Sequence, residues 1–169
     1  TAASTAIAPQ PVRQSNKKGV ATKSPTARRQ ITLEEFRRKY SNREDGYKYE
    51  FVKGEIVKTP SNMKIVQYHI VDNLNRRFVA TSAYANGDSL ASELEQITLP
   101  EQMRRPDLCY IRWEKVRANN ESISEFVIEI ISPTDRSVKV EEKVLEYFEA
   151  GVKVVWLLFP QTQTVHVYT

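Results

Sequence analysis

The sequence predicts an α/β or α+β fold, in which a mixed β-sheet is flanked by helices. Apolar residues recur at helical spacing in two long stretches, and the shorter runs between them are alternating or continuously apolar, as strands are. With 169 residues, 40% of them hydrophobic, the chain suits one domain with a sizeable core. The sequence shows no internal repeat, glycine-rich phosphate loop or paired-cysteine zinc spacing, which argues against a nucleotide-binding or zinc-finger protein.

Residues 1–30 differ from the rest of the chain in composition. They are rich in Ala, Thr, Ser, Pro and Gln, and we expect them to form a disordered basic tail or linker before a domain of residues 31–169. The tail holds six of the 25 basic residues and none of the 21 acidic ones, so the domain itself is about two charges negative. A linker is therefore favoured over a nucleic-acid-binding arm. The threonine at position 1 suggests a processed or truncated piece.

Ordered structure is expected to start with a short helix and a hairpin. Thr32 and Glu35 have the spacing of a capping box, which predicts a helix over residues 32–40. Aromatic residues then alternate with others in a strand pattern, and Lys53-Gly54 supplies the turn of a hairpin over residues 47–57.

A second helix is predicted from Ser61 or Asn62 to about Phe78. One face is expected to pack on a sheet, because apolar residues recur every four positions at Val66, Ile70, Leu74 and Phe78, with Met63 and Val71 alongside. His69 lies in this helix and is expected to be hydrogen-bonded or exposed, since no other histidine or cysteine is near it in sequence. Residues 92–99 are predicted to form one strand that ends at Pro100.

Two carboxylates lie where packing does not explain them. Asp107 stands just before an apolar strand, and Glu129 is the single charge in Phe126–Ile131, which is typical of a strand buried on both faces. An ionised carboxylate there is costly unless it is paired. A shared divalent cation would supply the partner, because hard cations bind carboxylate oxygens. A salt bridge or a hydrogen-bonded edge carboxylate is the alternative for each acid, but their place on consecutive strands favours a metal site.

The remaining elements are a helix and two strands. Ser132-Pro133-Thr134 is expected to end the strand and start a helix, and Ala150-Gly151 supplies its C-cap. Residues 152–159 and 164–168 are predicted strands. The buried stripe of the helix is expected to be Val140, Val144 and Phe148, with Leu145 beside them.

The single cysteine, Cys109, excludes an intrachain disulfide and is expected to be a small core residue. No apolar run is long enough to span a bilayer, and no secretory signal is visible. These features predict a soluble cytoplasmic protein without a membrane partner.

Six blocks of residues 31–169, in their order and spacing, resemble the Uma-type family of bacterial endonucleases, which has the PD-(D/E)XK restriction-endonuclease-like fold. They are Ile31–Phe36, Tyr49–Glu55, Arg105-Pro106-Asp107, Val127–Pro133, Glu142-Lys143 with Tyr147, and Ala150-Gly151-Val152 with Trp156. The resemblance implies metal-dependent hydrolysis of phosphodiester bonds, with DNA as the substrate. Relatives usually continue into further strands, so the C-terminal end of the sheet is expected to be truncated.

The resemblance also implies the members of an acidic metal site. Asp107 and Glu129 are the expected metal ligands. Glu50 completes the cluster as the first acidic position of the family, although the strand pattern alone makes it an exposed glutamate. Mg²⁺ is the expected ion because an all-oxygen site with room for water and phosphate suits it, and Mn²⁺ is a possible substitute.

A lysine is expected beside the scissile phosphate, and here the chain departs from the superfamily motif. The motif places lysine two residues after the second acid, where this chain has Ile131. Lys143 on the following helix is the expected replacement as a catalytic residue, and Lys139, one turn earlier, is its rival. The alternative for Lys143 is an exposed helix lysine paired with Glu146 or Glu142.

The sequence leaves two hypotheses of different class for the function of the protein. The first is a metal-dependent DNA endonuclease, for which a symmetric homodimer would address both strands. The second is a non-catalytic nuclease-like module that binds nucleic acid or a protein partner.

Overall fold

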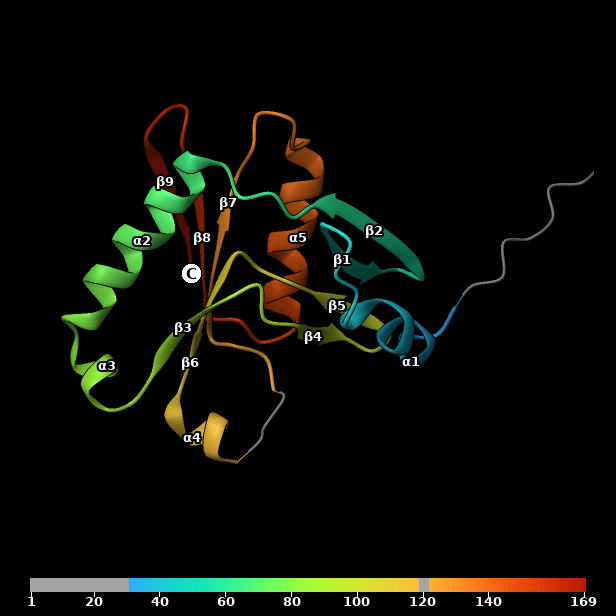
Figure 1. Cartoon of the computed structure of the whole chain (residues 1–169), viewed down its shortest axis with the longest axis horizontal. Helices are drawn as coiled ribbons and strands as arrows, with labels where there is room; N and C mark the ends of the chain where they lie inside the picture. Colours follow the sequence, from blue (N-terminus) through green and yellow to red (C-terminus); the bar gives the residue numbers. More distant parts are fainter. Residues whose placement is uncertain (1–30, 119–121) are drawn as a thin grey trace, which may run out of the picture.

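The computed structural model describes residues 31–118 and 122–169, so the segment 1–30 predicted as a tail lies outside the described residues. The described residues form an α+β fold with two β-sheets flanked by helices, and the predicted fold class is confirmed (Figure 1). Where the sequence suggested one mixed sheet, the strands separate into a four-stranded sheet and a five-stranded sheet.

The four-stranded sheet is antiparallel, with the strand order β2-β1-β5-β4. The hairpin turns at Lys53-Gly54 as predicted, and both residues have the positive φ angles that such a tight turn needs. The strands of this sheet are β1 (Tyr47–Val52), β2 (Glu55–Pro60), β4 (Gln96–Leu99) and β5 (Gln102–Arg104).

A short helical segment covers one face of this sheet. It consists of α1 (Leu33–Phe36), which runs directly into the π-helical segment η1 (Arg37–Ser41). The predicted capping box is present, because the Thr32 hydroxyl accepts a hydrogen bond from Glu35 N at 3.1 Å. The core between helix and sheet is formed by Phe36, Tyr49, Phe51 and Met103.

The five-stranded sheet has the order β3-β6-β7-β8-β9, and its β7 and β8 are parallel. Helix α5 (Ser137–Glu149) makes the connection that two parallel strands require. The strands are β3 (Ser89–Ser92), β6 (Leu108–Ile111), β7 (Phe126–Ile130), β8 (Val154–Phe159) and β9 (Thr164–Tyr168).

Helices α5 and α2 (Ile65–Val79) lie on opposite sides of this sheet, so β7 is covered on both faces (Figure 1). Val127 packs with Val144 and Tyr147 of α5, whereas Ile128 packs on the α2 side. Glu129 shares the face of Val127, because strand residues alternate. The architecture thus directs Glu129 toward α5.

Helix α2 begins at Ile65, three or four residues later than predicted. The Gln67 side chain accepts a hydrogen bond from Lys64 N at 3.0 Å and thereby satisfies a backbone donor at the start of the helix. Val66 is 51% exposed, and the partly buried face of the helix starts one turn later, at Ile70. His69 is exposed, in agreement with the expectation.

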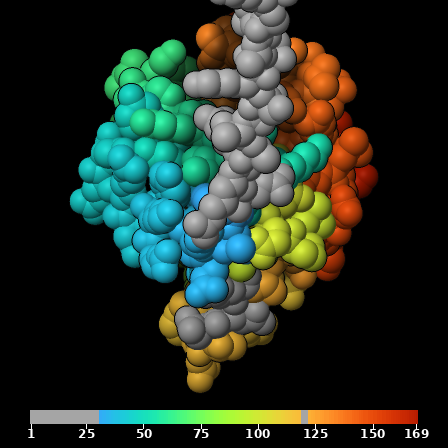
Figure 2. Space-filling model, turned by 90° about the vertical axis from the view of Figure 1, so that its right-hand side faces the viewer, coloured from blue at the N-terminus to red at the C-terminus, as the bar shows by residue number. Residues whose placement is uncertain are grey.

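The predicted strand over residues 92–99 is wrong as a single element. It is divided between β3 and β4, which belong to different sheets. Glu93 stands at the break with a φ of +50°, a conformation that interrupts an extended strand. After β4, a turn leads into β5, and Glu101 in this turn accepts a hydrogen bond from Leu33 N at 2.7 Å. Figure 2 shows this yellow-green turn beside the blue N-terminal helix.

Helix α5 also starts later than predicted, because residues 132–135 form a turn in which Asp135 accepts a hydrogen bond from Ser132 N at 2.7 Å. The expectation that Leu145 lies in the buried stripe is wrong, because Leu145 is 69% exposed. Tyr147, which was not predicted there, lies in the core instead. The glycine C-cap is confirmed, since Gly151 has a φ of +100° and its N–H donates to Phe148 O.

Two further helices, α3 (Ser82–Ala85) and α4 (Trp113–Arg117), were not predicted. Cys109 is a buried core residue, as expected. Within residues 31–118 and 122–169, no helix has the length and apolar character needed to cross a membrane.

Candidate active site

Asp107 and Glu129 are placed opposite each other by the pairing of β6 with β7. The strands pair antiparallel with Leu108 opposite Ile128, and this register, continued by one residue, brings the two carboxylates together. A hydrogen bond fixes the first of them, because Asp107 Oδ2 accepts from Ile130 N at 2.7 Å. The two acids that the sequence singled out therefore stand at one end of this strand pair.

Helix α5 contributes a lysine and a tyrosine to Glu129. Lys143 Nζ lies 2.7 Å from Glu129 Oε1, and the Tyr147 hydroxyl donates to the same oxygen at 2.6 Å. The two side chains are four residues apart and so project from the same face of the helix. Both interactions use Oε1, which leaves Oε2 of Glu129 for a further ligand.

Glu50 brings the four-stranded sheet into the site. Its Oε1 accepts a hydrogen bond from Arg105 N at 2.9 Å and lies 3.3 Å from Lys143 Nζ, while Oε2 lies 3.4 Å from Arg104 Nη1. Glu50 is only 5% exposed, so the expectation from the strand pattern that it is exposed is wrong. Strand alternation identifies the face on which a residue lies, but here α5 and the side chain of Arg104 cover that face.

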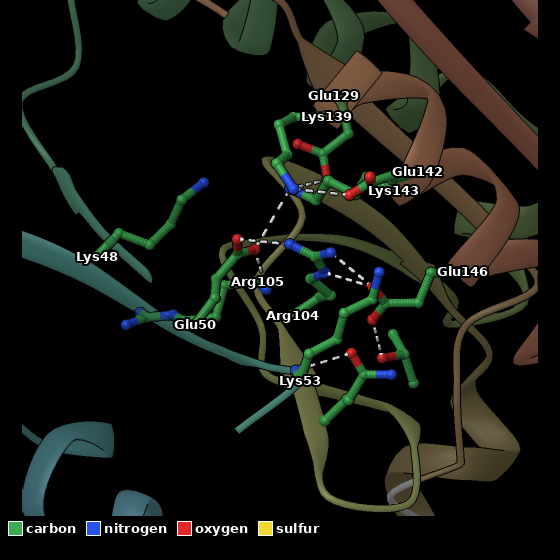
Figure 3. Close-up of polar contacts among 12 residues, drawn as sticks. Lys48, Glu50, Lys53, Arg104, Arg105, Glu129, Lys139, Glu142, Lys143 and Glu146 are labelled. Carbon is green, nitrogen blue, oxygen red and sulfur yellow. Dashed lines mark hydrogen bonds and ion pairs between the residues drawn. The ribbon is translucent and has the colours of Figure 1, made fainter. Parts of the chain in front are cut away.

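Arg104 extends the ionic contacts away from the site. Its Nη2 and Nε lie 2.5 Å and 3.0 Å from Glu146 Oε2, and the Thr98 hydroxyl donates to the other carboxylate oxygen of Glu146. Figure 3 shows the Arg104 guanidinium between the carboxylates of Glu50 and Glu146. All four side chains are buried, so the buried charges are paired, as burial requires.

The structure distinguishes the two candidate lysines by position. Lys143 contacts the carboxylates of Glu50 and Glu129, whereas Lys139 pairs with Glu142 at 2.9 Å on the exposed side of α5. Lys143 is thus not the exposed lysine, paired with Glu142 or Glu146, that was the alternative.

The charges in the cluster shift one another's pKa values. Burial raises the pKa of Glu50, but Lys143 and Arg104 outweigh it and leave this pKa at about 2. Burial is also the largest influence on Glu129, and it raises the pKa of that carboxyl despite the nearby Lys143. For Lys143 itself, burial favours the neutral amine, yet Glu129 and Glu50 raise the pKa above its ordinary value. Lys143 is therefore protonated at neutral pH.

Three residues of the site were not predicted. Lys48 Nζ lies 2.9 Å from Asp107 Oδ1, Arg104 joins Glu50 to Glu146, and Tyr147 contacts Glu129. Lys48 is two residues before Glu50 on β1, so strand alternation could have placed it on the same face. Helical spacing from Lys143 could likewise have placed Tyr147. No pattern in the sequence identifies Arg104, which meets Glu50 through the pairing of β1 with β5 and meets Glu146 through the packing of α5 on this sheet.

The donor groups suit a hard cation with few protein ligands. In the described part of the chain, no group of three or more His, Cys, Asp or Glu side chains is arranged so that it could hold a metal ion. Asp107 and Glu129 together offer two carboxylates at one end of a strand pair. Mg²⁺ commonly uses only one or two carboxylates, with waters and substrate phosphate as its remaining ligands. The residues present therefore fit Mg²⁺ bound in this manner.

Comparisons with known proteins identify a family and a similar solved structure. Residues 33–169 match the family model Uma2, described as "Putative restriction endonuclease". Among solved structures, the chain is similar to the crystal structure of a putative nuclease belonging to DUF820 from Anabaena variabilis ATCC 29413. The two are 25% identical with a TM-score of 0.67, and the similarity covers 82% of this chain and 79% of the other. None of the curated proteins matches.

Proposed function

The chain belongs to the Uma2 family of putative restriction endonucleases, and we propose that it is a metal-dependent endonuclease that hydrolyses phosphodiester bonds in DNA. The observation that carries the proposal is the meeting of Asp107, Glu129 and Lys143 at one end of the β6–β7 pair. A carboxylate pair with an adjacent ammonium group is the combination that phosphodiester hydrolysis needs, since it supplies metal ligands and a fixed positive charge.

The proposed roles follow from the contacts. Asp107 and Glu129 would hold Mg²⁺, or Mn²⁺ in its place. The bound ion would neutralise charge on the phosphate and favour deprotonation of a water molecule. Lys143 is protonated and so cannot accept the proton of that water; it orients the water and stabilises the charge that develops on the phosphate. Glu50 completes the acidic cluster and contacts the Lys143 ammonium from the side of the four-stranded sheet.

Charge complementarity supports a divalent ion. The site contains three carboxylates, Glu50, Asp107 and Glu129, and two ammonium groups, Lys48 and Lys143, while Arg104 and Glu146 balance each other. One net negative charge remains. A divalent cation would change it to one positive charge, which matches the single negative charge of a phosphodiester.

The test is incubation with supercoiled plasmid DNA and Mg²⁺ or Mn²⁺, with and without a chelator. We expect nicking or linearisation that the chelator suppresses and that Asp107→Asn and Glu129→Gln abolish without loss of the fold. Glu125→Gln is the matched control, because Glu125 pairs with Arg112 on the surface, away from the site. Cleavage by both site variants at the wild-type rate would place the activity elsewhere.

A second candidate is a non-catalytic module of the same fold that binds DNA. The observation in its favour is that each site carboxylate already has a basic partner within the chain. In that case the protein retards DNA in a gel with or without metal, and prolonged incubation with Mn²⁺ leaves the plasmid intact.

A further inference from the structure

Lys48 is a charged side chain of the site to which the proposed hydrolysis assigns no role. It lies on β1 two residues before Glu50, so both side chains project from the same face of that strand. Its Nζ is 2.9 Å from Asp107 Oδ1. Figure 3 shows Lys48 approaching the carboxylates from β1, while Lys143 approaches from α5.

Lys48 occupies the one carboxylate oxygen of Asp107 that the backbone does not use. Asp107 Oδ2 is already engaged by the hydrogen bond from Ile130 N, so Oδ1 is the more open of the two oxygens for a metal, and Lys48 holds it. A divalent ion at Oδ1 and the Lys48 ammonium would repel each other, because like charges a few ångströms apart are unfavourable even near a protein surface. The two cations therefore compete for one atom.

The ion pair between Lys48 and Asp107 is partly exposed to solvent. The Lys48 side chain is 13% exposed and that of Asp107 is 21% exposed, so the pair lies at the solvent side of the site. A lysine carries its charge on a flexible four-carbon stem with three donors, and the group can turn to another anion without a change in the backbone. A lysine ammonium paired with a carboxylate is charged at neutral pH.

We propose that Lys48 is a further catalytic residue, which holds Asp107 Oδ1 in the metal-free protein and binds a non-bridging oxygen of the DNA phosphate when that carboxylate serves a metal. The inference rests on the proposed function of the site. It predicts two effects of opposite sign: removal of the Lys48 charge strengthens metal binding and weakens DNA binding. If the ion pair with Asp107 were purely structural, removal of the Lys48 charge would weaken the fold and leave DNA binding unchanged.

The first measurement is calorimetric titration of the DNA-free protein with Mn²⁺. Lys48→Met removes the competing charge, and we expect it to bind Mn²⁺ about tenfold more tightly, or more. Lys58→Met is the matched control, because Lys58 lies on the same hairpin but stacks on the ring of Tyr47, on the opposite face. Lys48→Arg keeps the charge and should bind Mn²⁺ as the wild type does.

The second measurement is the affinity for a short fluorescent DNA duplex across a salt series. It is made in Ca²⁺, which also binds carboxylates, and separately in a chelator. In Ca²⁺, Lys48→Met should lower the slope of log affinity against log salt by about one unit, because one phosphate contact is lost. In chelator the slope should equal that of the wild type, since Lys48 is then held by Asp107. Lys58→Met and Lys48→Arg should match the wild type in both conditions.

Unchanged Mn²⁺ affinity together with an unchanged slope in Ca²⁺ would overturn the inference, and so would an equal loss of slope in both conditions. If such results accompany normal metal-dependent cleavage by the wild type, only the role of Lys48 fails. If the wild type binds neither Mn²⁺ nor DNA, the proposed function fails and the inference fails with it. Lys48→Gln, which keeps a hydrogen-bond donor for Asp107, replaces Lys48→Met should the latter not fold.

Discussion

At the scale of single residues, the two lysines of α5 give the sharpest contrast. Lys143 lies 2.7 Å from Glu129, whereas Lys139 pairs with Glu142 in solvent. We expect Lys143→Met to lower the cleavage rate by roughly 10²–10³-fold, the usual cost of losing one donor that stabilises transition-state charge. Lys139→Met is the control and should be nearly silent. A damaging Lys139→Met with an active Lys143→Met would contradict the assignment.

Glu50 predicts a particular dependence of stability on pH. Its pKa is about 2 in the folded protein against an ordinary value of 4.5, so the ionised form is favoured by folding. The resulting contribution, roughly 3 kcal/mol, is present above pH 4.5 and is lost as the pH falls toward 2. Urea unfolding of the wild type and Glu50→Gln should therefore differ most at pH 6 and converge near pH 2–3. A constant difference across this range would show that the carboxylate charge is not what stabilises the fold.

Some residues of the site could be predicted from the sequence, but their burial and their contacts could not. Local patterns identify Asp107 and Glu129, because one precedes an apolar strand and the other interrupts one. The same local reasoning fails for Glu50, whose burial depends on α5 and β5, which are distant in sequence. The contact between Lys48 and Asp107 joins residues 59 positions apart and is likewise invisible to any local pattern.

At the scale of elements, the ion pair between Arg104 and Glu146 joins β5 to α5. Removing one partner of a buried pair leaves an uncompensated charge, so Arg104→Met should lower the free energy of unfolding by about 3–5 kcal/mol. Replacing both partners, as Arg104→Met with Glu146→Leu, should recover part of that loss, because no uncompensated charge remains at position 146, whereas Glu50 still lacks Arg104.

Urea unfolding of the two single variants and the double variant measures this coupling. Additive losses would mean that the two side chains do not stabilise the fold as a pair. The exposed Arg112–Glu125 pair is the control, and its removal should cost at most about 1 kcal/mol.

Element types followed from the sequence more reliably than element ends. Continuous apolar character predicted β7 and β8, and apolar spacing predicted α2 and α5. The starts of both helices were placed too early, because polar segments before them form a turn and a cap rather than helix. The division between β3 and β4 was missed, since only the backbone conformation of Glu93 and the separate sheets reveal it.

At the scale of the whole molecule, net charge divides between the basic segment 1–30 and a slightly acidic domain. If the six basic residues of that segment were all to contact phosphate, the salt dependence of DNA affinity would steepen by roughly five units of log K per log salt. We expect a linker instead, because the segment has no aromatic residue to stack on bases. A salt series on the full chain and on residues 31–169 should give nearly parallel lines. A drop of several units on deletion would show that the segment binds DNA.

The two sheets were the main feature of the fold that the sequence did not predict. The number and type of strands indicated an α+β protein, but the division into two sheets depends on pairing between strands distant in sequence, such as Phe51 of β1 opposite Met103 of β5. A long-range ion pair also joins Glu50 of the four-stranded sheet to Lys143 of α5, which in turn contacts Glu129 of the five-stranded sheet. The site thus lies where the sheets meet, and its formation depends on the folding of the whole domain.

Asp107 and Glu129 are proposed to share a divalent metal, and thermal melting in Mn²⁺ is the simplest direct test of this shared site. A ligand that binds only the folded state stabilises it by about 2.7 kcal/mol at a hundred times its dissociation constant. We therefore expect the melting temperature of the wild type to rise with Mn²⁺, and those of Asp107→Asn and Glu129→Gln to remain constant. An equal rise in all three proteins, or none in the wild type, would contradict the claim.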